Sequence, residues 1–194
     1  MDRIHLKYLA SDDNRCKFAT MNEYLPISEI NRLLSLKKRL IGDKDEYRLS
    51  FGYGKSKHDL VLVSNSQGNC ETFLLSIIRS EKRLLKITFH HMRKADSQFL
   101  LRVDLSGAHF NPPEITEALP QKFRPYASRF IKGPHVHYYV EGYESRWALP
   151  FEETEFKEWS HITDLEQSLQ GIINKISEII NLDSKIIYDP HLSL

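Results

Sequence analysis

The sequence predicts an α+β fold in which a curved antiparallel sheet of about six strands is packed by an N-terminal and a C-terminal amphipathic helix. Apolar residues recur at helical spacing near the two ends of the chain, whereas the middle alternates between polar and apolar residues or has short apolar runs. Most connections between these runs are too short for a helical crossover, which favours antiparallel neighbours. We expect the sheet to be either open or partly closed into a barrel.

The two helices are predicted from their apolar periodicity. Residues 27–41 carry apolar side chains at helical spacing, close with basic residues and stop at Gly42. Residues 163–181 begin with a capping sequence and continue with apolar side chains at four-three-four-three spacing. The tail at 185–188 could add a strand or dock as an extended segment.

Six strands are predicted between these helices, and hairpin residues such as Glu141-Gly142 connect them. After the fourth strand, residues 106–133 form a long basic loop with several prolines, and loops of this length are usually functional or mobile. The predicted strands span residues 59–64, 72–78, 84–91, 98–105, 134–140 and 145–151.

Length and composition indicate one domain over residues 1–194, because 194 residues with 41% hydrophobic content can bury one sizeable core. Residues 1–25 are ambiguous and are either part of this domain or an N-terminal appendage. The start of the chain does not resemble an export signal, and no apolar run approaches membrane-spanning length, so we expect a cytoplasmic protein with no membrane partner. Cys16 and Cys70 lie far apart, which suits reduced thiols.

The formal net charge of +1 hides basic clusters, one of which runs from Lys122 to Lys132 without an acidic residue. A nucleic-acid binder usually carries a larger positive excess, so the charge permits a nucleic-acid partner without requiring one.

A candidate site follows from the phase of the strands. Alternate side chains of a strand share a face, so His135 and His137 project together. The apolar residues of the neighbouring strands define their buried face, and the polar residues then gather on the opposite face. A solvated sheet face would look the same from the sequence, and we weigh the two interpretations equally. The polar face would carry Lys86, Thr88, His90, Arg102, Asp104, His135, His137, Tyr139 and Arg146.

One function for this face is RNA cleavage without a metal. His135 and His137 would transfer protons, and Asp104 would orient a histidine. We expect no cofactor and no metal: Asp104 or His109 could complete a three-ligand set with the histidine pair, but no H-E-x-x-H or C-x-x-C motif supports one. The residues predicted to bind phosphate or nucleic acid are Arg102, Arg146, Lys86, Tyr139, Lys122, Arg124 and Arg129.

The motifs around this face resemble those of a family of small bacterial and phage-borne proteins, a domain of unknown function. The motifs are Arg102-x-Asp104-x-x-Gly107, His109-x-Asn111-Pro112, Pro134-His135-x-His137-x-Tyr139-x-Glu141-Gly142-Tyr143 and Trp147-Ala148-x-Pro150. The resemblance covers about residues 60–182, and this chain has a longer basic insertion between Pro112 and Pro134. It implies a shared sheet and site, and association with mobile elements or toxin–antitoxin pairs.

The leading expectation is therefore a nucleic-acid-directed, toxin-like protein, such as an endoribonuclease, whose partner is RNA or another nucleic acid. An antitoxin or a host factor would be its protein partner. The alternative is a non-catalytic inhibitor or interaction module of a mobile element or phage, which would use the cluster at 122–132 and the acidic stretch at 141–158 as docking patches. A metal-dependent hydrolase ranks third.

Overall fold

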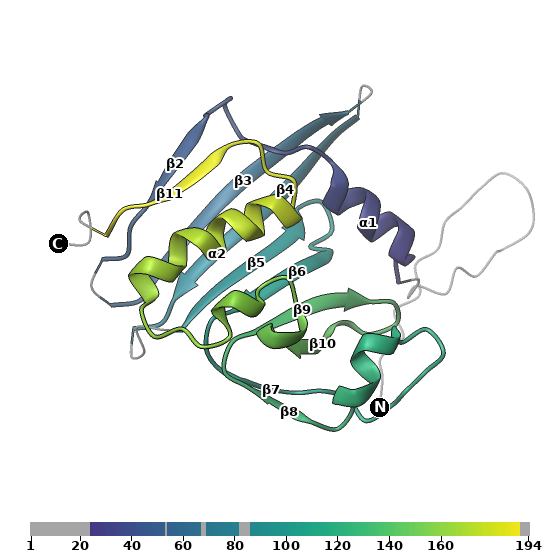
Figure 1. The fold of residues 1–194 in the computed structure, drawn as a ribbon. Coiled ribbons are helices and arrows are strands. Elements are labelled where there is room, and N and C mark those ends of the chain that lie inside the picture. The colour runs from purple at the N-terminus through teal and green to yellow at the C-terminus, as the bar shows by residue number, and fades with distance from the viewer. Residues whose placement is uncertain (1–23, 53, 67–68, 82–85, 191–194) are drawn as a thin grey trace, which may run out of the picture.

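A seven-stranded antiparallel sheet forms the centre of the fold (Figure 1). The structure is a computed structural model that describes residues 24–190 apart from 53, 67–68 and 82–85. The predicted α+β class is confirmed, and the sheet is open, with β1 and β10 at its edges. In spatial order its strands are β1 (Arg39–Leu40), β3 (Ser56–Ser66), β4 (Asn69–Arg79), β5 (Ile87–Arg93), β6 (Phe99–Asp104), β9 (His135–Val140) and β10 (Glu144–Pro150).

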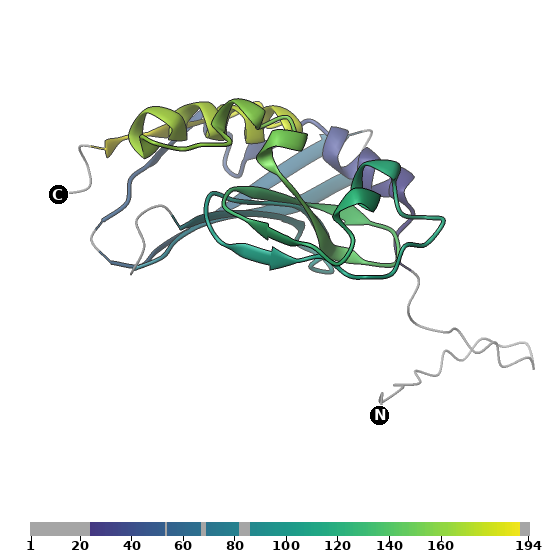
Figure 2. The same cartoon turned by 60° about the horizontal axis from the view of Figure 1, so that its bottom comes forward.

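Two helices cover one face of this sheet (Figure 2). Helix α1 (Ile27–Ser35) buries Ile30 and Leu33, and helix α2 (Leu165–Ile179) buries a stripe that includes Leu169 and Ile176. The side chain of Asp164 accepts a hydrogen bond from the backbone of Gln167, which confirms the predicted cap of α2. Neither these helices nor any other in the described ranges is long and apolar enough to cross a membrane.

The prediction that the first helix extends to residue 41 is wrong. Leu36 adopts an extended conformation after α1, and Arg39 and Leu40 pair with β3 as the edge strand β1. Leu40 is buried in the main core, so its apolar character serves the sheet edge and not a helix face. Gly42 then takes a positive φ of 77° in the following turn, a conformation that glycine adopts without strain.

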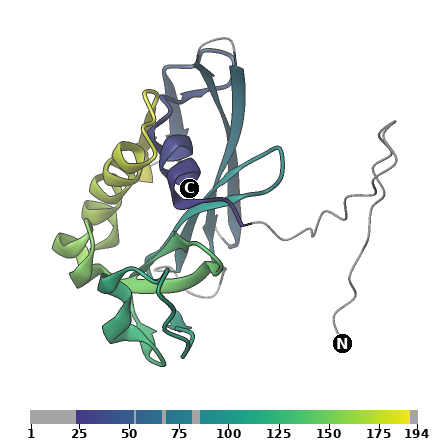
Figure 3. The same ribbon diagram turned by 90° about the vertical axis from the view of Figure 1, so that its right-hand side faces the viewer.

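A parallel two-stranded ribbon lies beside α2. It joins β2 (Glu46–Leu49), which the sequence pattern did not predict, to β11 (Lys185–Tyr188), so the tail adds a strand. Figure 3 views the sheet from its side and shows α2 on one side of it. Residues 1–23, with Cys16, lie outside the described ranges, and Cys70 is a free, exposed thiol.

The segment 106–133, which was expected to be one long loop, contains β7 (Ala108–Phe110), the 3-10 helix η1 (Gln121–Tyr126) and β8 (Phe130–Lys132). Strands β7 and β8 pair as a short antiparallel ribbon. The fully buried side chain of Asn111 bonds the backbone N–H and C=O of Ala148 on β10 and the carbonyl of Tyr126. The segment thereby covers the outer edge of β10, whose backbone groups could otherwise pair with another chain. Two further 3-10 turns, η2 (Phe151–Glu153) and η3 (Lys157–Trp159), follow β10.

A buried lysine joins the ends of both helices. The Lys38 ammonium donates hydrogen bonds to carbonyl oxygens of Leu33 at 2.8 Å, Leu34 at 3.0 Å, Leu36 at 2.8 Å and Ile180 at 2.8 Å. These carbonyls lie at the C-terminal ends of α1 and α2, where orphan backbone acceptors and the helix dipole both favour a cation. Burial lowers the pKa of Lys38 to about 7.

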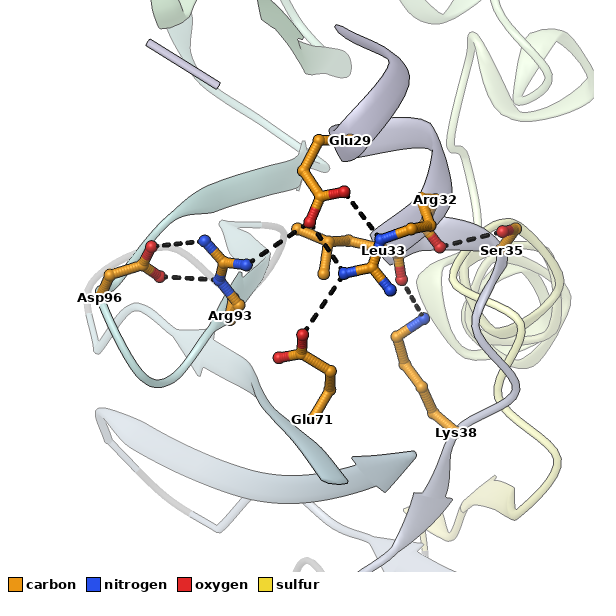
Figure 4. Close-up of polar contacts among 8 residues, drawn as sticks. All are labelled: Glu29, Arg32, Leu33, Ser35, Lys38, Glu71, Arg93 and Asp96. Atoms are coloured by element: carbon orange, nitrogen blue, oxygen red, sulfur yellow. Dashed lines mark hydrogen bonds and ion pairs between the residues drawn. The ribbon is translucent and has the colours of Figure 1, made fainter. Parts of the chain in front are cut away.

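Ion pairs fasten the exposed side of α1 to the sheet (Figure 4). Arg32 binds Glu29 at 2.7 Å and Glu71 of β4 at 3.3 Å, and Arg93 of β5 binds Asp96 at 2.6 Å and Glu29 at 3.7 Å. Such partly exposed pairs contribute little individually, so they fix the position of α1 more than they stabilise the fold.

Replacing Lys38 with methionine should lower the free energy of unfolding by about 2–4 kcal/mol, because buried carbonyls lose their donor while the apolar stem is kept. The control is Lys37→Met, since Lys37 is exposed and makes an ion pair with Asp183. It should cost less than about 1 kcal/mol. Urea unfolding measures both, and equal losses would contradict the role of Lys38.

Acid should destabilise the protein through His91, which is buried in the helix-side core against Phe73. Burial lowers the pKa of His91 to about 3. The unfolded chain takes up this proton near pH 6.5, so below that pH the folded state loses about 1.4 kcal/mol of stability per pH unit. His91→Phe should reduce the stability lost between pH 8 and pH 5 by about 2 kcal/mol. Urea unfolding at both pH values checks this, with His161→Phe, at an exposed position, as the control. An unchanged acid loss in His91→Phe would argue against it.

Candidate functional site

The strand register places the polar side chains together on the face of the sheet opposite the helices. Arg102 pairs with His137 across β6 and β9, Asp104 pairs with His135, and Thr88 of β5 pairs with Asp104. The alternate residues of these strands, such as Val103 and Val136, belong to the core under the helices. The predicted phase of β5, β6 and β9 therefore agrees with the register at these positions.

Asp104 is the centre of this group, and its side chain is only 4% exposed. Its Oδ1 accepts hydrogen bonds from the Thr88 hydroxyl and, at 3.2 Å, from Arg102 Nη2. Arg102 Nε lies 2.7 Å from Oδ2 as an ion pair, but Oδ2 accepts no hydrogen bond of proper alignment. Burial by itself raises the pKa of Asp104, yet the contacts with Arg102 and Thr88 oppose it, and this pKa lies well below its usual range.

Backbone carbonyls fix the orientation of both histidines. His135 Nδ1 lies 2.8 Å from the carbonyl oxygen of Gly133, and His137 Nδ1 lies 2.8 Å from that of Ser145. A carbonyl oxygen only accepts, so each Nδ1 carries the hydrogen, and each neutral ring keeps its lone pair on Nε2. Metal-binding histidines are commonly held in this way, by donation from the other ring nitrogen.

The two Nε2 atoms point to the same carboxylate oxygen. Asp104 Oδ2 is 3.6 Å from His135 Nε2 and 3.4 Å from His137 Nε2. These separations exceed the length of a charge-assisted hydrogen bond, which is about 2.7–2.9 Å. Ligands about 2.0–2.2 Å from a zinc ion at tetrahedral angles lie about 3.3–3.6 Å apart, which matches the observed distances.

Asp104, His135 and His137 thus form a candidate metal centre. In the part of the chain that the structure describes, they are the one group of three such residues whose ligand atoms lie within 4.8 Å of one another. All three are buried. Burial also lowers the pKa of His135, so its imidazole is neutral near pH 7 and an anionic carboxylate faces a lone pair. A cation bound between these groups would stabilise them, because both the carboxylate and the lone pair are electron donors.

A pocket of about 120 Å³ opens over these residues, roofed by the β7–β8 ribbon. The ring of His109 on β7 stands edge-on to that of His137, with the ring centroids 4.5 Å apart, and its Nε2 donates to the carbonyl of Arg146 at 2.9 Å. Gly107 has a φ of 154°, and a Cβ there would lie 3.6 Å from the His135 ring, so glycine lets the backbone pass close to the site. The other lining residues are Lys86, Arg102, Ser106 and Ala108.

Several predicted site residues lie elsewhere. Tyr139 was expected on the polar face, but it is buried in the core, and its hydroxyl donates to the carbonyl of Leu25 at 2.6 Å. The start of α1 lies at the same end of β9, because the backbone N–H of its first residue, Ile27, donates to the carboxylate of Glu141. Arg146 contributes its carbonyl to His109, while its exposed side chain does not line the pocket.

The predicted basic cluster at 122–132 does not gather at the pocket. Lys122 lies over the ring of Tyr138, 4.0 Å from its centroid, on the side opposite His137, and Arg124 bonds the carbonyl of Leu119 within the same 3-10 region. Arg129 directly precedes β8 and is exposed. None of these three lines the pocket, whereas Lys86 does.

Sequence reasoning also missed an aromatic pair. Phe110 is 48% exposed and contacts Phe130, which is 66% exposed. Strands of three residues are too short for alternation to reveal which side chains face outward.

Comparison with known families adds one finding. The model of a family of unknown function, DUF6978, matches residues 25–177. The chain belongs to this family. No curated protein and no solved structure matches the chain. Membership of DUF6978 assigns no activity to the chain.

Removing the hydroxyl of Thr88 should destabilise the protein, because the buried Asp104 carboxylate would lose a hydrogen-bond donor. We expect Thr88→Val to lower the free energy of unfolding by about 1–3 kcal/mol. Thr88→Ser keeps the hydroxyl and should cost clearly less. Chemical denaturation of the three proteins at neutral pH checks this, and equal stability of the valine variant and the parent would refute the role of the hydrogen bond.

Proposed function

We propose that this DUF6978 protein is a divalent-metal-dependent hydrolase of phosphate esters, with Asp104, His135 and His137 as the metal ligands. The observation that carries the proposal is the convergence of both Nε2 atoms on Asp104 Oδ2, with each Nδ1 tied to a backbone carbonyl. Two imidazoles and a carboxylate suit zinc and related transition metals.

Hydrolysis follows from the open coordination of such a centre. Three protein ligands leave a position for water, and a bound zinc ion lowers the pKa of that water to about 7. His109 supports the chemistry: its Nε2 donates to the Arg146 carbonyl, so its Nδ1 keeps a lone pair, and burial lowers its pKa. We assign His109 as the base that takes the proton of the water.

The charges around the pocket favour an anionic substrate. Lys86 and Arg102 both line it, and Arg102 keeps part of its guanidinium free because Asp104 engages only Nε and Nη2. Guanidinium and ammonium groups recognise phosphate oxygens and stabilise charge that develops on them. These contacts support a phosphate ester as the substrate class.

We prefer this mechanism to RNA cleavage by the free imidazoles. In a metal-free mechanism one histidine would remove a proton on one side of the phosphate and another would donate a proton on the other side. Here the two Nε2 atoms lie within 4.8 Å of each other around one carboxylate oxygen, which leaves no room for a phosphate between them.

Metal titration of the protein, first stripped with EDTA, tests the proposal. Calorimetry with Zn²⁺ and Mn²⁺ should show one ion bound per chain. His135→Ala and His137→Ala should each weaken binding by more than the roughly 10- to 100-fold that loss of an outer-shell partner costs. His161→Ala, at an exposed position outside the pocket, is the control and should bind as the parent does.

Activity is measured next with bis(p-nitrophenyl) phosphate, a small activated diester that releases p-nitrophenolate and needs no macromolecular binding surface. The metal-loaded protein should hydrolyse it, and His109→Gln should lower the rate by about 100-fold or more while metal binding persists. Failure to bind any divalent metal would overturn the proposal. Turnover that persists in EDTA would instead favour the metal-free mechanism.

A further inference from the structure

We infer that the outward face of the β7–β8 ribbon binds a single strand of nucleic acid, which makes single-stranded RNA or DNA the substrate class of the pocket. The inference rests on the proposed hydrolase function for its catalytic consequence. The juxtaposition that carries it is an exposed aromatic pair and flanking cations on the same ribbon that roofs the candidate metal centre.

The two faces of the ribbon have different roles. Phe110 and Phe130 are directly opposite each other in the register, with ring centroids 4.9 Å apart. The neighbouring pair, His109 and Ile131, faces the other way: Ile131 is buried and His109 stands over the site. On the inward face, Ile131 packs in the protein and His109 stands over the site. On the outward face, both rings of the aromatic pair stay largely exposed in the described structure.

The surroundings of the pair suit a polyanion better than a protein core. Arg129 precedes Phe130, Lys132 follows it by two residues, and both are exposed. The stretch from 119 to 133 holds four basic residues and no acidic one. Exposed rings between cations are the arrangement with which proteins stack unpaired bases and hold the phosphates beside them.

The ribbon also connects this face to the pocket. Lys132 pairs with Ala108, one step further along the outward face from the phenylalanine pair, and Ala108 lines the pocket. Two residues of a strand span about 7 Å, so a base stacked on Phe110 or Phe130 brings the next phosphates to Lys132 and the rim. A duplex keeps its bases stacked inside and cannot use these rings.

Fluorescence anisotropy of a labelled oligonucleotide of about 12 residues, a length within the usual range for stacking surfaces, tests the inference. The full chain is titrated in EDTA, so that binding is read without metal-dependent cleavage, and RNA and DNA strands are separate arms. The single strand should bind more tightly than a duplex of the same sequence. Phe110→Ala and Phe130→Ala should each weaken binding by about 5- to 100-fold.

Matched variants separate stacking from folding. Phe110→Trp keeps an aromatic face and should retain binding, and Ile41→Ala removes an equally exposed apolar side chain, 56% exposed, at the opposite edge of the sheet and should change nothing. Lys132→Gln should reduce the slope of log affinity against log salt by about 0.7. The phenylalanine variants should still bind metal and hydrolyse the small diester.

Equal affinity for single strand and duplex would overturn the inference, and so would alanine variants that bind like the parent. Either failure leaves metal binding and hydrolysis of the small diester as separate results, so it is distinguishable from failure of the proposed function. If the protein binds the single strand but no metal, the ribbon is supported as a nucleic-acid-binding surface and the proposed hydrolase function is overturned.

Discussion

The register between β6 and β9 is the constraint on which both faces of the sheet depend. It sets Asp104 beside His135 and Arg102 beside His137 on one face, and it sets Val103 beside Val136 under the helices on the other. Because side chains alternate along a strand, a slip of one residue would bury the charges under the helices and expose the valines. The burial of the apolar face therefore maintains the backbone positions from which the residues of the candidate metal centre project.

The motifs that first marked this region acquire distinct structural roles. Exposed Arg102 and buried Asp104 form an ion pair, and Gly107 brings the backbone over His135. Asn111 closes the edge of β10 through the backbone of Ala148. Gly107 and Asn111 both belong to the segment between β6 and β9, which folds back over the strands that it joins. Edge protection and site construction are thus performed by the same segment.

Much of this could be predicted from periodicity, and the rest depended on contacts distant in sequence. The apolar residues of β5 and β6 determine which side chains face outward, so the grouping of Asp104 with His135 and His137 was predictable. The end of α1 was not, because Lys38 finds its partner at Ile180, 142 residues away. Tyr139 has the same phase as the two histidines, yet it is buried in the core, where its hydroxyl bonds Leu25, a contact that the phase could not predict. The presence of a metal site could not be decided before the ring orientations were known, since an H-x-H pair alone does not say where its lone pairs point.

The buried ammonium of Lys38 also has a consequence for the order in which the chain matures during synthesis. Three of its acceptors, Leu33, Leu34 and Leu36, lie within five residues of Lys38, whereas the fourth, Ile180, follows it by 142 residues. The family match ends at residue 177, before this acceptor and before β11. The burial of Lys38 between the two helices can therefore be completed only after Ile180 has been synthesised, beyond the end of the matched region.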